Sequence, residues 1–427
     1  MMLSKALAGK ISLRLLPFLF ILYIISYLDR INLSFAALEM NNDLKFSAQD
    51  FGFGSGIFFL GYCLFGIPSN YVIEKIGPRR WIAGIMVLWG FITIGMCLVK
   101  DPMSFFIMRF VLGAAEAGFF PGMLLYLTYW FPKDLYGTAV ARFMTAIPAA
   151  GLLGSVVAAR ALSMGGHMDI AGWKWLFIIT GIPAIVLGAL VPFLIPDNPL
   201  KANWLSETEK SEIKEALAQE AGGATSDSAK EKSPFIDVAR FALIYFTLTV
   251  SMYGYQFWLP QIVRATTKAD DSVVSLLTAI PAIFQAGGML LIAASSDKKG
   301  ERRLHLVLAT VITIAGLCLA SLGGQPQIAA YAGVLTLSAL SLAAFGIWGA
   351  VGPFWALTRG GLKKESQAAG IAFINSVGNL GGFAGPFLIG YIKQNTEGFG
   401  PSLLSLAAAA VFASLLAFTS KEKGKIS

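Results

Sequence analysis

Four charged residues lie inside stretches of sequence that are otherwise almost entirely apolar. Asp29 and Arg30 are neighbours in the first such stretch, and Arg109 and Glu116 share a later one. A charge at the centre of a bilayer costs about 2.5–3.5 kcal/mol on insertion scales, so four of them require an explanation. Arginines can hold an anion and acids can carry protons. These residue types therefore predict a site that binds an anion and exchanges protons.

The spacing of these residues predicts their relative depth. Seven residues are two helical turns, which places Arg109 and Glu116 on one face about 10 Å apart. Counted from the outer ends of their helices, Arg30 and Arg109 lie at similar depth and could hold one anion together. The alternative is structural: an acid neutralises an arginine so that the helices can pack. His167 and His305 fall outside the expected centre, so the carboxylates are the expected proton carriers.

Other polar and aromatic residues in the apolar stretches are candidates to complete a binding cavity. Each has a second interpretation, because membrane tyrosines often lie at the interface and buried amides often bond a neighbouring helix. The candidates for substrate binding are Tyr27, Tyr62, Tyr253, Gln256, Asn375 and Asn379.

These residues must be positioned by membrane-spanning helices. The chain has 427 residues, of which 56% are hydrophobic and 14% charged, whereas soluble domains carry about 25% charged residues. Long, continuous apolar runs of about 20 residues predict helices that span the lipid bilayer, not the alternating strands of a barrel. We expect an all-α membrane protein with twelve transmembrane helices. They begin near Leu15, Phe51, Trp81, Phe105, Gly137, Gly172, Phe241, Val274, Leu304, Ile328, Ala368 and Ser402.

The distribution of charge predicts the topology. The net charge is +8, and most of the 33 lysines and arginines fall on one side of the membrane. The positive-inside rule then places both termini in the cytoplasm. We expect the protein to lie in a bacterial inner membrane. The positive-inside distribution explains the positive net charge, so we expect no nucleic acid as a binding partner.

The longest polar interval, residues 196–240, predicts a central cytoplasmic linker. It divides the chain into an N-terminal six-helix half at residues 1–195 and a C-terminal half at residues 241–427. Within the linker, Ser206 followed by Glu209 is typical of a capping box, which predicts the start of a short surface helix.

A charged loop pattern occurs twice at a constant offset, which indicates two related halves. Charge-assisted bonds at these glycine turns would hold the halves together in one state and release them in another. The alternative is a pair of solvated positive loops. The predicted gating residues are Glu74, Lys75, Gly77, Arg79 and Arg80 in the first half, and Asp297, Lys298, Gly300, Arg302 and Arg303 in the second.

Small residues spaced four apart, such as Gly118 with Gly122 and Gly378 with Gly382, predict close contacts between helices. The three cysteines lie in apolar segments, which argues against a disulfide framework or a zinc cluster. The sequence lacks a phosphate loop, a paired-histidine motif and a nucleophile elbow. We therefore expect no enzyme activity, no cofactor and no metal.

Several motifs resemble the anion:cation symporter family of the major facilitator superfamily, and the resemblance covers nearly the whole chain. The repeated charged loop resembles the signature loop of the superfamily. The residues from Tyr27 to Asn70 are most similar to the tartrate- and phthalate-type organic acid transporters, although Gly66 stands where that branch often has a glutamate. The matching positions are Tyr27 to Asn32, Pro68 to Asn70, Arg109, Gly113, Glu116, Ala117, Phe120, Pro121, Tyr253, Gly254, Trp258 to Pro260, Asp197, Pro199, Ala202, Trp204 and Leu205.

The resemblance implies a proton-coupled symporter that imports a small organic carboxylate, such as tartrate, a sugar acid or an aromatic acid, by alternating access. It implies that Arg30 binds the carboxylate and that Asp29 and Glu116 are the proton-coupling sites. We expect the protein to function as a monomer. The alternatives are a proton-coupled exporter or antiporter, and a transport-derived receptor with no flux. The region of Gly151 and Gly154 lacks the glycine- and proline-rich run of antiporters, which argues mildly against export.

Overall fold

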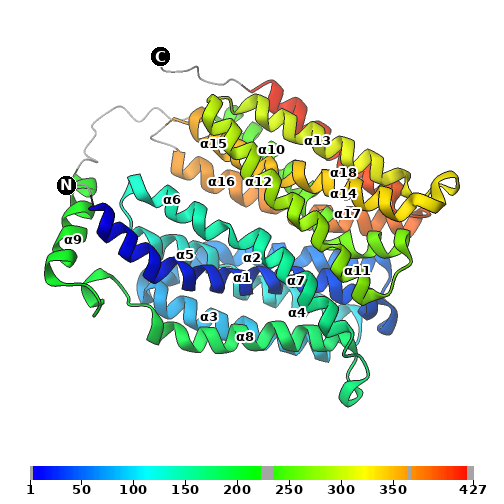
Figure 1. Ribbon diagram of the computed structural model, residues 1–427, viewed down its shortest axis with the longest axis horizontal. Coiled ribbons are helices and arrows are strands. Elements are labelled where there is room, and N and C mark those ends of the chain that lie inside the picture. The colour runs from blue at the N-terminus through cyan, green and yellow to red at the C-terminus, as the bar shows by residue number, and fades with distance from the viewer. Residues whose placement is uncertain (1–2, 223–233, 364–366, 421–427) are drawn as a thin grey trace.

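The computed structural model describes residues 3–222, 234–363 and 367–420, and the secondary structure of these residues is helical throughout (Figure 1). Residues 223–233 of the expected linker lie outside the described residues. In the described part of the chain, 12 helical segments are long and apolar enough to cross a membrane. The predicted all-α membrane fold is therefore confirmed.

Helices satisfy every backbone hydrogen bond within the segment, which hydrocarbon requires. Seven of the spanning segments are single helices and five are pairs of collinear helices. The single helices are α1 (Lys5–Asp43), α2 (Ala48–Ile76), α3 (Pro78–Gly95), α8 (Gly172–Leu194), α10 (Phe235–Thr267), α13 (Arg303–Ser321) and α18 (Gly400–Phe418). The pairs are α4 (Pro102–Glu116) with α5 (Phe119–Thr128), α6 (Lys133–Met144) with α7 (Ala146–Leu162), α11 (Asp271–Leu277) with α12 (Ala279–Lys299), α14 (Ala332–Gly349) with α15 (Val351–Gly361), and α16 (Gln367–Asn379) with α17 (Gly381–Asn395).

The helices from α1 to α8 and those from α10 to α18 form two halves that lie side by side (Figure 1). In the first half α3 packs on α8, α2 packs on α4, and α1 packs on α7 and α8. In the second half α10 packs on α16, α17 and α18, and α14 packs on α12 and α13. The N-terminus and α9 (Glu207–Gly222) lie at one end of the bundle, which we call the linker end. The opposite end, where α1 and α10 finish, is the far end.

The two halves are in close contact near the far end. Helix α2 packs along α17, and glycines on both helices make this approach possible. A Cβ atom on Gly52 would lie 2.6 Å from the carbonyl oxygen of Pro386, and one on Gly390 would lie 2.5 Å from that of Ala48. Neither site could accept a side chain unless the helices moved apart. The structure is therefore a conformation that is closed at the far end.

The linker helix α9 is attached to the first half. Lys10 on α1 forms an ion pair with Glu209 at 2.8 Å, and the backbone nitrogen of Ser4 donates to Glu212 at 2.6 Å. Ser206 and Glu209 exchange both bonds of the predicted capping box. This part of the linker is therefore placed to move with the first half.

Candidate functional site

Two of the four membrane-buried charges form an ion pair between α1 and α4. The Nη2 atom of Arg30 lies 3.2 Å from Oε2 of Glu116. The side chain of Glu116 is fully buried, whereas 16% of the Arg30 side chain is exposed. The second carboxylate oxygen of Glu116 has no hydrogen-bond partner among the described residues. Arg30 is thus the member of the pair that a solute can reach.

Asp29 precedes Arg30 on α1 and lies close to Glu116, in a small polar network. Its Oδ1 atom accepts a hydrogen bond from the Thr93 hydroxyl at 2.7 Å and one from the Asn32 amide at 3.2 Å. The same amide donates to Thr180 at 2.9 Å. The aspartate is fully buried, and its Oδ2 atom has no partner among the described residues. A proton on Oδ2 would leave this network intact.

Arg109 is fully buried on α4. Its Nε atom donates to the carbonyl of Gly54 at 3.4 Å, and both terminal nitrogens lack hydrogen-bond partners within the described part of the chain. The guanidinium carbon lies 4.8 Å from the ring centre of Phe58, and that of Arg30 lies 5.4 Å from the same centre. The two predicted arginines therefore meet at one aromatic ring, and such contacts partly offset the cost of burying a cation.

A glycine on α4 makes this meeting possible. A Cβ atom on Gly113 would lie 1.9 Å from the carbonyl oxygen of Phe58. Only glycine lets α4 approach α2 closely enough to place Arg109 and Phe58 in contact. Gly113 lies between Arg109 and Glu116 in sequence, so one close helix contact positions both charged side chains.

Three tyrosines that the sequence predicted as substrate-binding residues lie around this cluster. Tyr62 on α2 has its ring centre 5.3 Å from the guanidinium carbon of Arg30. Tyr27 is buried on α1, and its polar neighbours include Gln285 and Trp348 of the second half. Tyr253 on α10 packs its ring against Phe59 at 4.3 Å.

The remaining candidates lie on the second half. Gln256 on α10 lines a pocket between the two halves. Asn379 is partly buried at the end of α16, whereas Asn375 on the same helix is exposed. The neighbouring glycines serve packing: a Cβ on Gly378 would overlap the Tyr245 ring, and one on Gly382 would overlap the Phe59 ring.

The first charged loop contacts the start of the linker, and the second makes a contact within its own half. Arg79 pairs with Asp197 at the start of the linker at 3.2 Å, and Arg302 pairs with Asp297. Burial alone would raise the pKa of Asp197, but the hydrogen bond from Lys201 and the charge of Arg79 outweigh it and hold the pKa below its usual value.

The structure also gives the surroundings of the other predicted gating residues. Lys75 lies over the Tyr71 ring at 4.3 Å, and Arg303 donates to the carbonyl of Ser420 at 3.4 Å. Gly77 and Gly300 adopt positive φ angles of 84° and 67°, which other residues rarely adopt. Glu74, Arg80 and Lys298 are exposed side chains of the same loops.

Several residues of the site were not assigned a role from the sequence. Thr93 donates to Asp29, and Thr180 accepts from Asn32, which also bonds Asp29. Phe58 contacts both arginines, and Gln285 lies next to Tyr27. Threonine and phenylalanine are ordinary in a membrane helix, so they carried no signal. Gln285 did carry one, because an amide inside an apolar run must find a partner.

The fold and this site together define a class of protein. In the described part of the chain, twelve spanning segments in two halves enclose a cluster of two arginines and two acids, of which Arg30 alone is partly exposed. Among the described residues no group of three or more metal-ligating side chains occurs. Such an arrangement is typical of a membrane transporter of small solutes.

The chain belongs to the Major Facilitator Superfamily, whose family model matches residues 19–386. It is 42% identical over 409 residues to a "Putative tartrate transporter" of Agrobacterium vitis, covering 95% of this chain and 89% of that one. It is 37% identical over 421 residues to a "Quinolone resistance transporter" of Acinetobacter baumannii, covering 97% and 95% of the two chains. These relatives confirm the resemblance to transporters that the motifs indicated.

Solved structures agree on the fold. A crystal structure of a D-xylose-proton symporter superposes with a TM-score of 0.75 at 18% identity, over 97% of this chain and 99% of that one. The protein is therefore a multi-pass membrane transporter of the major facilitator fold.

Proposed function

We propose that this protein is a proton-coupled symporter that imports a small organic carboxylate by alternating access. The observation that carries the proposal is the ion pair between partly exposed Arg30 and buried Glu116, with Asp29 and Arg109 close by. An arginine that already has a carboxylate partner can exchange it for the carboxylate of a substrate once that partner is neutralised.

The charge balance of the cluster gives the coupling. Two arginines and two ionised acids have no net charge, so a substrate anion gains little from the site. Protonation of Glu116 releases Arg30, and protonation of Asp29 leaves a second positive charge uncompensated. The fully protonated cluster then matches a dianion in charge. Proton uptake and anion uptake therefore favour each other, which is the requirement for symport.

The membrane potential explains why coupling is useful. Moving one charge across 100 mV is worth about 2.3 kcal/mol, so a monoanion entering a negative interior alone would pay that amount. One proton cancels this cost, and a second makes the potential favourable.

The membrane arrangement is part of the proposal. We place the protein in a bacterial inner membrane, with both termini and the linker at 196–240 in the cytoplasm. The halves at 1–195 and 241–427 would rock about the site, with the two charged loops as gates. The conformation closed at the far end is then the inward-facing state. A single chain contains all these parts, so we propose a functional monomer.

The test is uptake by purified protein in liposomes. Labelled tartrate, sugar acids and aromatic carboxylates are offered with and without an inward proton gradient. We expect the gradient to drive accumulation of one class. Arg30→Ala should abolish it, whereas Arg160→Ala, which removes an exposed arginine of α7, should not.

Export is the second candidate, because one relative is named for quinolone resistance. Absence of carboxylate flux in either direction, with folded protein confirmed, would contradict our proposal. Gradient-driven efflux of a quinolone in the same liposomes would then favour the exporter. Specific binding of a carboxylate without flux would favour a receptor.

A further inference from the structure

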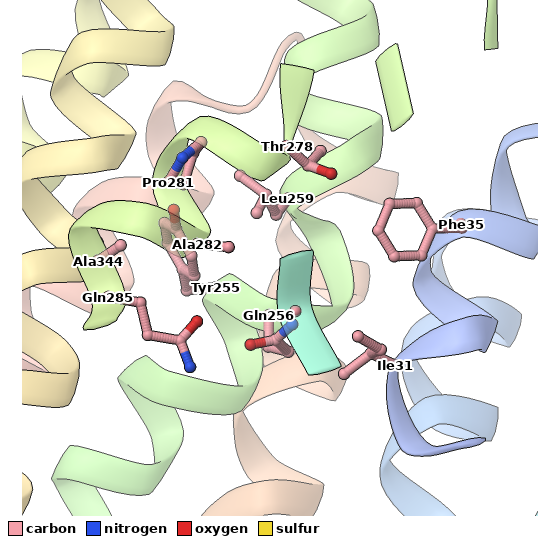
Figure 2. A pocket seen from close by; sticks show the side chains of 11 residues that line it. Ile31, Phe35, Tyr255, Gln256, Leu259, Thr278, Pro281, Ala282, Gln285 and Ala344 are labelled. Atoms are coloured by element: carbon pink, nitrogen blue, oxygen red, sulfur yellow. The ribbon is translucent and has the colours of Figure 1, made fainter. Parts of the chain in front are cut away.

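A narrow pocket between the two halves contains a buried amide nitrogen that has no hydrogen-bond partner among the described residues. Its free volume is about 20 Å³, enough for one water-sized group. Ile31, Phe35 and Gly151 line it from the first half, and Gln256 and Gln285 line it from the second. Figure 2 shows the two glutamine side chains directed toward one another from separate helices, with Ile31 and Phe35 on the facing side.

Gln285 on α12 is the unusual member of this pocket. Its side chain is only 5% exposed, and its Nε2 atom has no hydrogen-bond partner among the described residues. A buried amide nitrogen without a partner is destabilising, so it is available to donate to a ligand that enters the pocket. The hydroxyls of Tyr255 and Thr278, which line the same pocket, donate to the Leu340 carbonyl at 2.9 Å and to that of Ser275 at 2.6 Å instead of to this amide.

The pocket is adjacent to the anion site. Tyr27 lies one helical turn before Arg30 on α1, and both Arg30 and Gln285 are among its polar neighbours. A molecule bound to the guanidinium of Arg30 could therefore extend past Tyr27 toward the two amides. It would contact both halves of the protein at once.

We propose that Gln285, together with Gln256, binds a hydroxyl group of the substrate and so selects hydroxylated carboxylates. This inference rests on the proposed function. An amide offers both a donor and an acceptor, which matches a hydroxyl, whereas an aliphatic or aromatic carbon would leave the amide unsatisfied. Tartrate and sugar acids fit this requirement, and aromatic acids without hydroxyls do not.

Three four-carbon dicarboxylates provide a matched test. Tartrate, malate and succinate share the same carboxylates and differ in the number of hydroxyl groups. Inhibition of labelled tartrate uptake by each acid is measured with the reconstituted protein. We expect tartrate to compete at least about tenfold better than succinate, because a site built for a hydroxyl rejects analogues that lack it.

Variants assign this preference to the pocket. Gln285→Met keeps the shape of the side chain and should reduce the preference for tartrate about tenfold while succinate competes as before. Gln325→Met, which changes an exposed glutamine in a connecting segment, is the matched control. Should Gln285→Met not fold, Gln256→Met tests the other amide.

Two outcomes would overturn the inference. Equal competition by tartrate and succinate in the unaltered protein, with transport intact, would refute hydroxyl selection but leave the proposed symport standing. If all three acids inhibited tartrate uptake less strongly, and to the same extent, in both glutamine variants, the glutamines would have a structural role instead. Absence of any carboxylate transport would overturn both the inference and the proposed function.

Discussion

At the scale of single residues, the site depends on which charges have partners. Arg30 has Glu116, whereas the terminal nitrogens of Arg109 have no hydrogen-bond partner in the described part of the chain. In this conformation Arg109 is also fully buried, so of these two arginines it is Arg30 that has a partly exposed side chain. We interpret Arg30 as the contact that a substrate makes first. Arg109 would supply positive potential behind the Phe58 ring.

Glu116→Gln should separate coupling from transport. The amide keeps the shape of the side chain but cannot exchange a proton, so Arg30 is permanently released. We expect gradient-driven accumulation to fall at least about tenfold, equivalent to about 1.4 kcal/mol of lost driving force. Exchange of labelled for unlabelled substrate should persist. Both rates are measured in liposomes.

Glu397→Gln, which changes an exposed acid between α17 and α18, is the control for this experiment. Loss of exchange and accumulation together would indicate a structural role for Glu116. Unchanged accumulation would remove this residue from the coupling site.

At the scale of elements, close helix contacts position the charges. Gly113→Ala should push α4 away from the Phe58 carbonyl, since the added carbon would lie 1.9 Å from that oxygen. We expect a loss of about 1–3 kcal/mol in stability, typical of overpacking, together with reduced uptake. Thermal unfolding of the purified protein in detergent measures the first effect.

Gly84→Ala is the matched control, because a Cβ atom at this α3 position meets nothing within 4 Å. Alanine favours a helix over glycine by about 0.5–1 kcal/mol, so this variant should be neutral or slightly more stable. Equal effects of the two substitutions would contradict the role of the α2–α4 contact.

Attachment of α9 should depend on pH. The hydrogen bond from Lys10, followed by that from the Ser206 backbone, lowers the pKa of Glu209 from its ordinary 4.5. Because this pKa is lowered, ionised Glu209 stabilises the attached state when the pH is above the ordinary pKa of a glutamate. This contribution is lost as the pH falls through the lowered pKa. Amide exchange in α9, corrected for intrinsic rates, should therefore become faster as the pH is lowered from about 7 to about 3.

Glu209→Gln should raise exchange in α9 at neutral pH and reduce its pH dependence. Exchange that is equally slow at both pH values in the unaltered protein would show that apolar contacts, such as the stacking of Trp204 on Trp130, hold the helix.

At the scale of the whole molecule, the far end is held closed by a contact between the halves. Arg264 on α10 donates to the carbonyl of Leu38 on α1 and pairs with Asp271 at 3.2 Å. Because the guanidinium joins both halves, it opposes the opening that alternating access requires. We call these three residues the far-end latch.

Arg264→Gln should open this latch. A charged hydrogen bond is worth about 1.5–3 kcal/mol, so the ratio of far-end-open to far-end-closed molecules should rise roughly tenfold or more. Spin labels at Asn42 and Asp270, one on each half at this end, should report longer distances. Labels at Arg142 and Arg359 near the linker end should report shorter ones.

Lys268→Gln, which changes a neighbouring cation on the same rim, is the control for the latch. Distances at the two ends that do not change in opposite directions would contradict a rocking motion of two halves.

Sequence and tertiary structure decided different features of this protein. The sequence alone determined the twelve helices, because apolar length and charge exclusion from lipid act locally along the chain. It also identified the four buried charges, since each is costly wherever its helix packs. Which charges pair depends on helix rotation and approach, so only the structure joined Arg30 to Glu116 and placed Asp29 with Thr93. The same holds for the far-end latch and for the pocket around Gln285, which join residues of both halves and form only when the halves pack together.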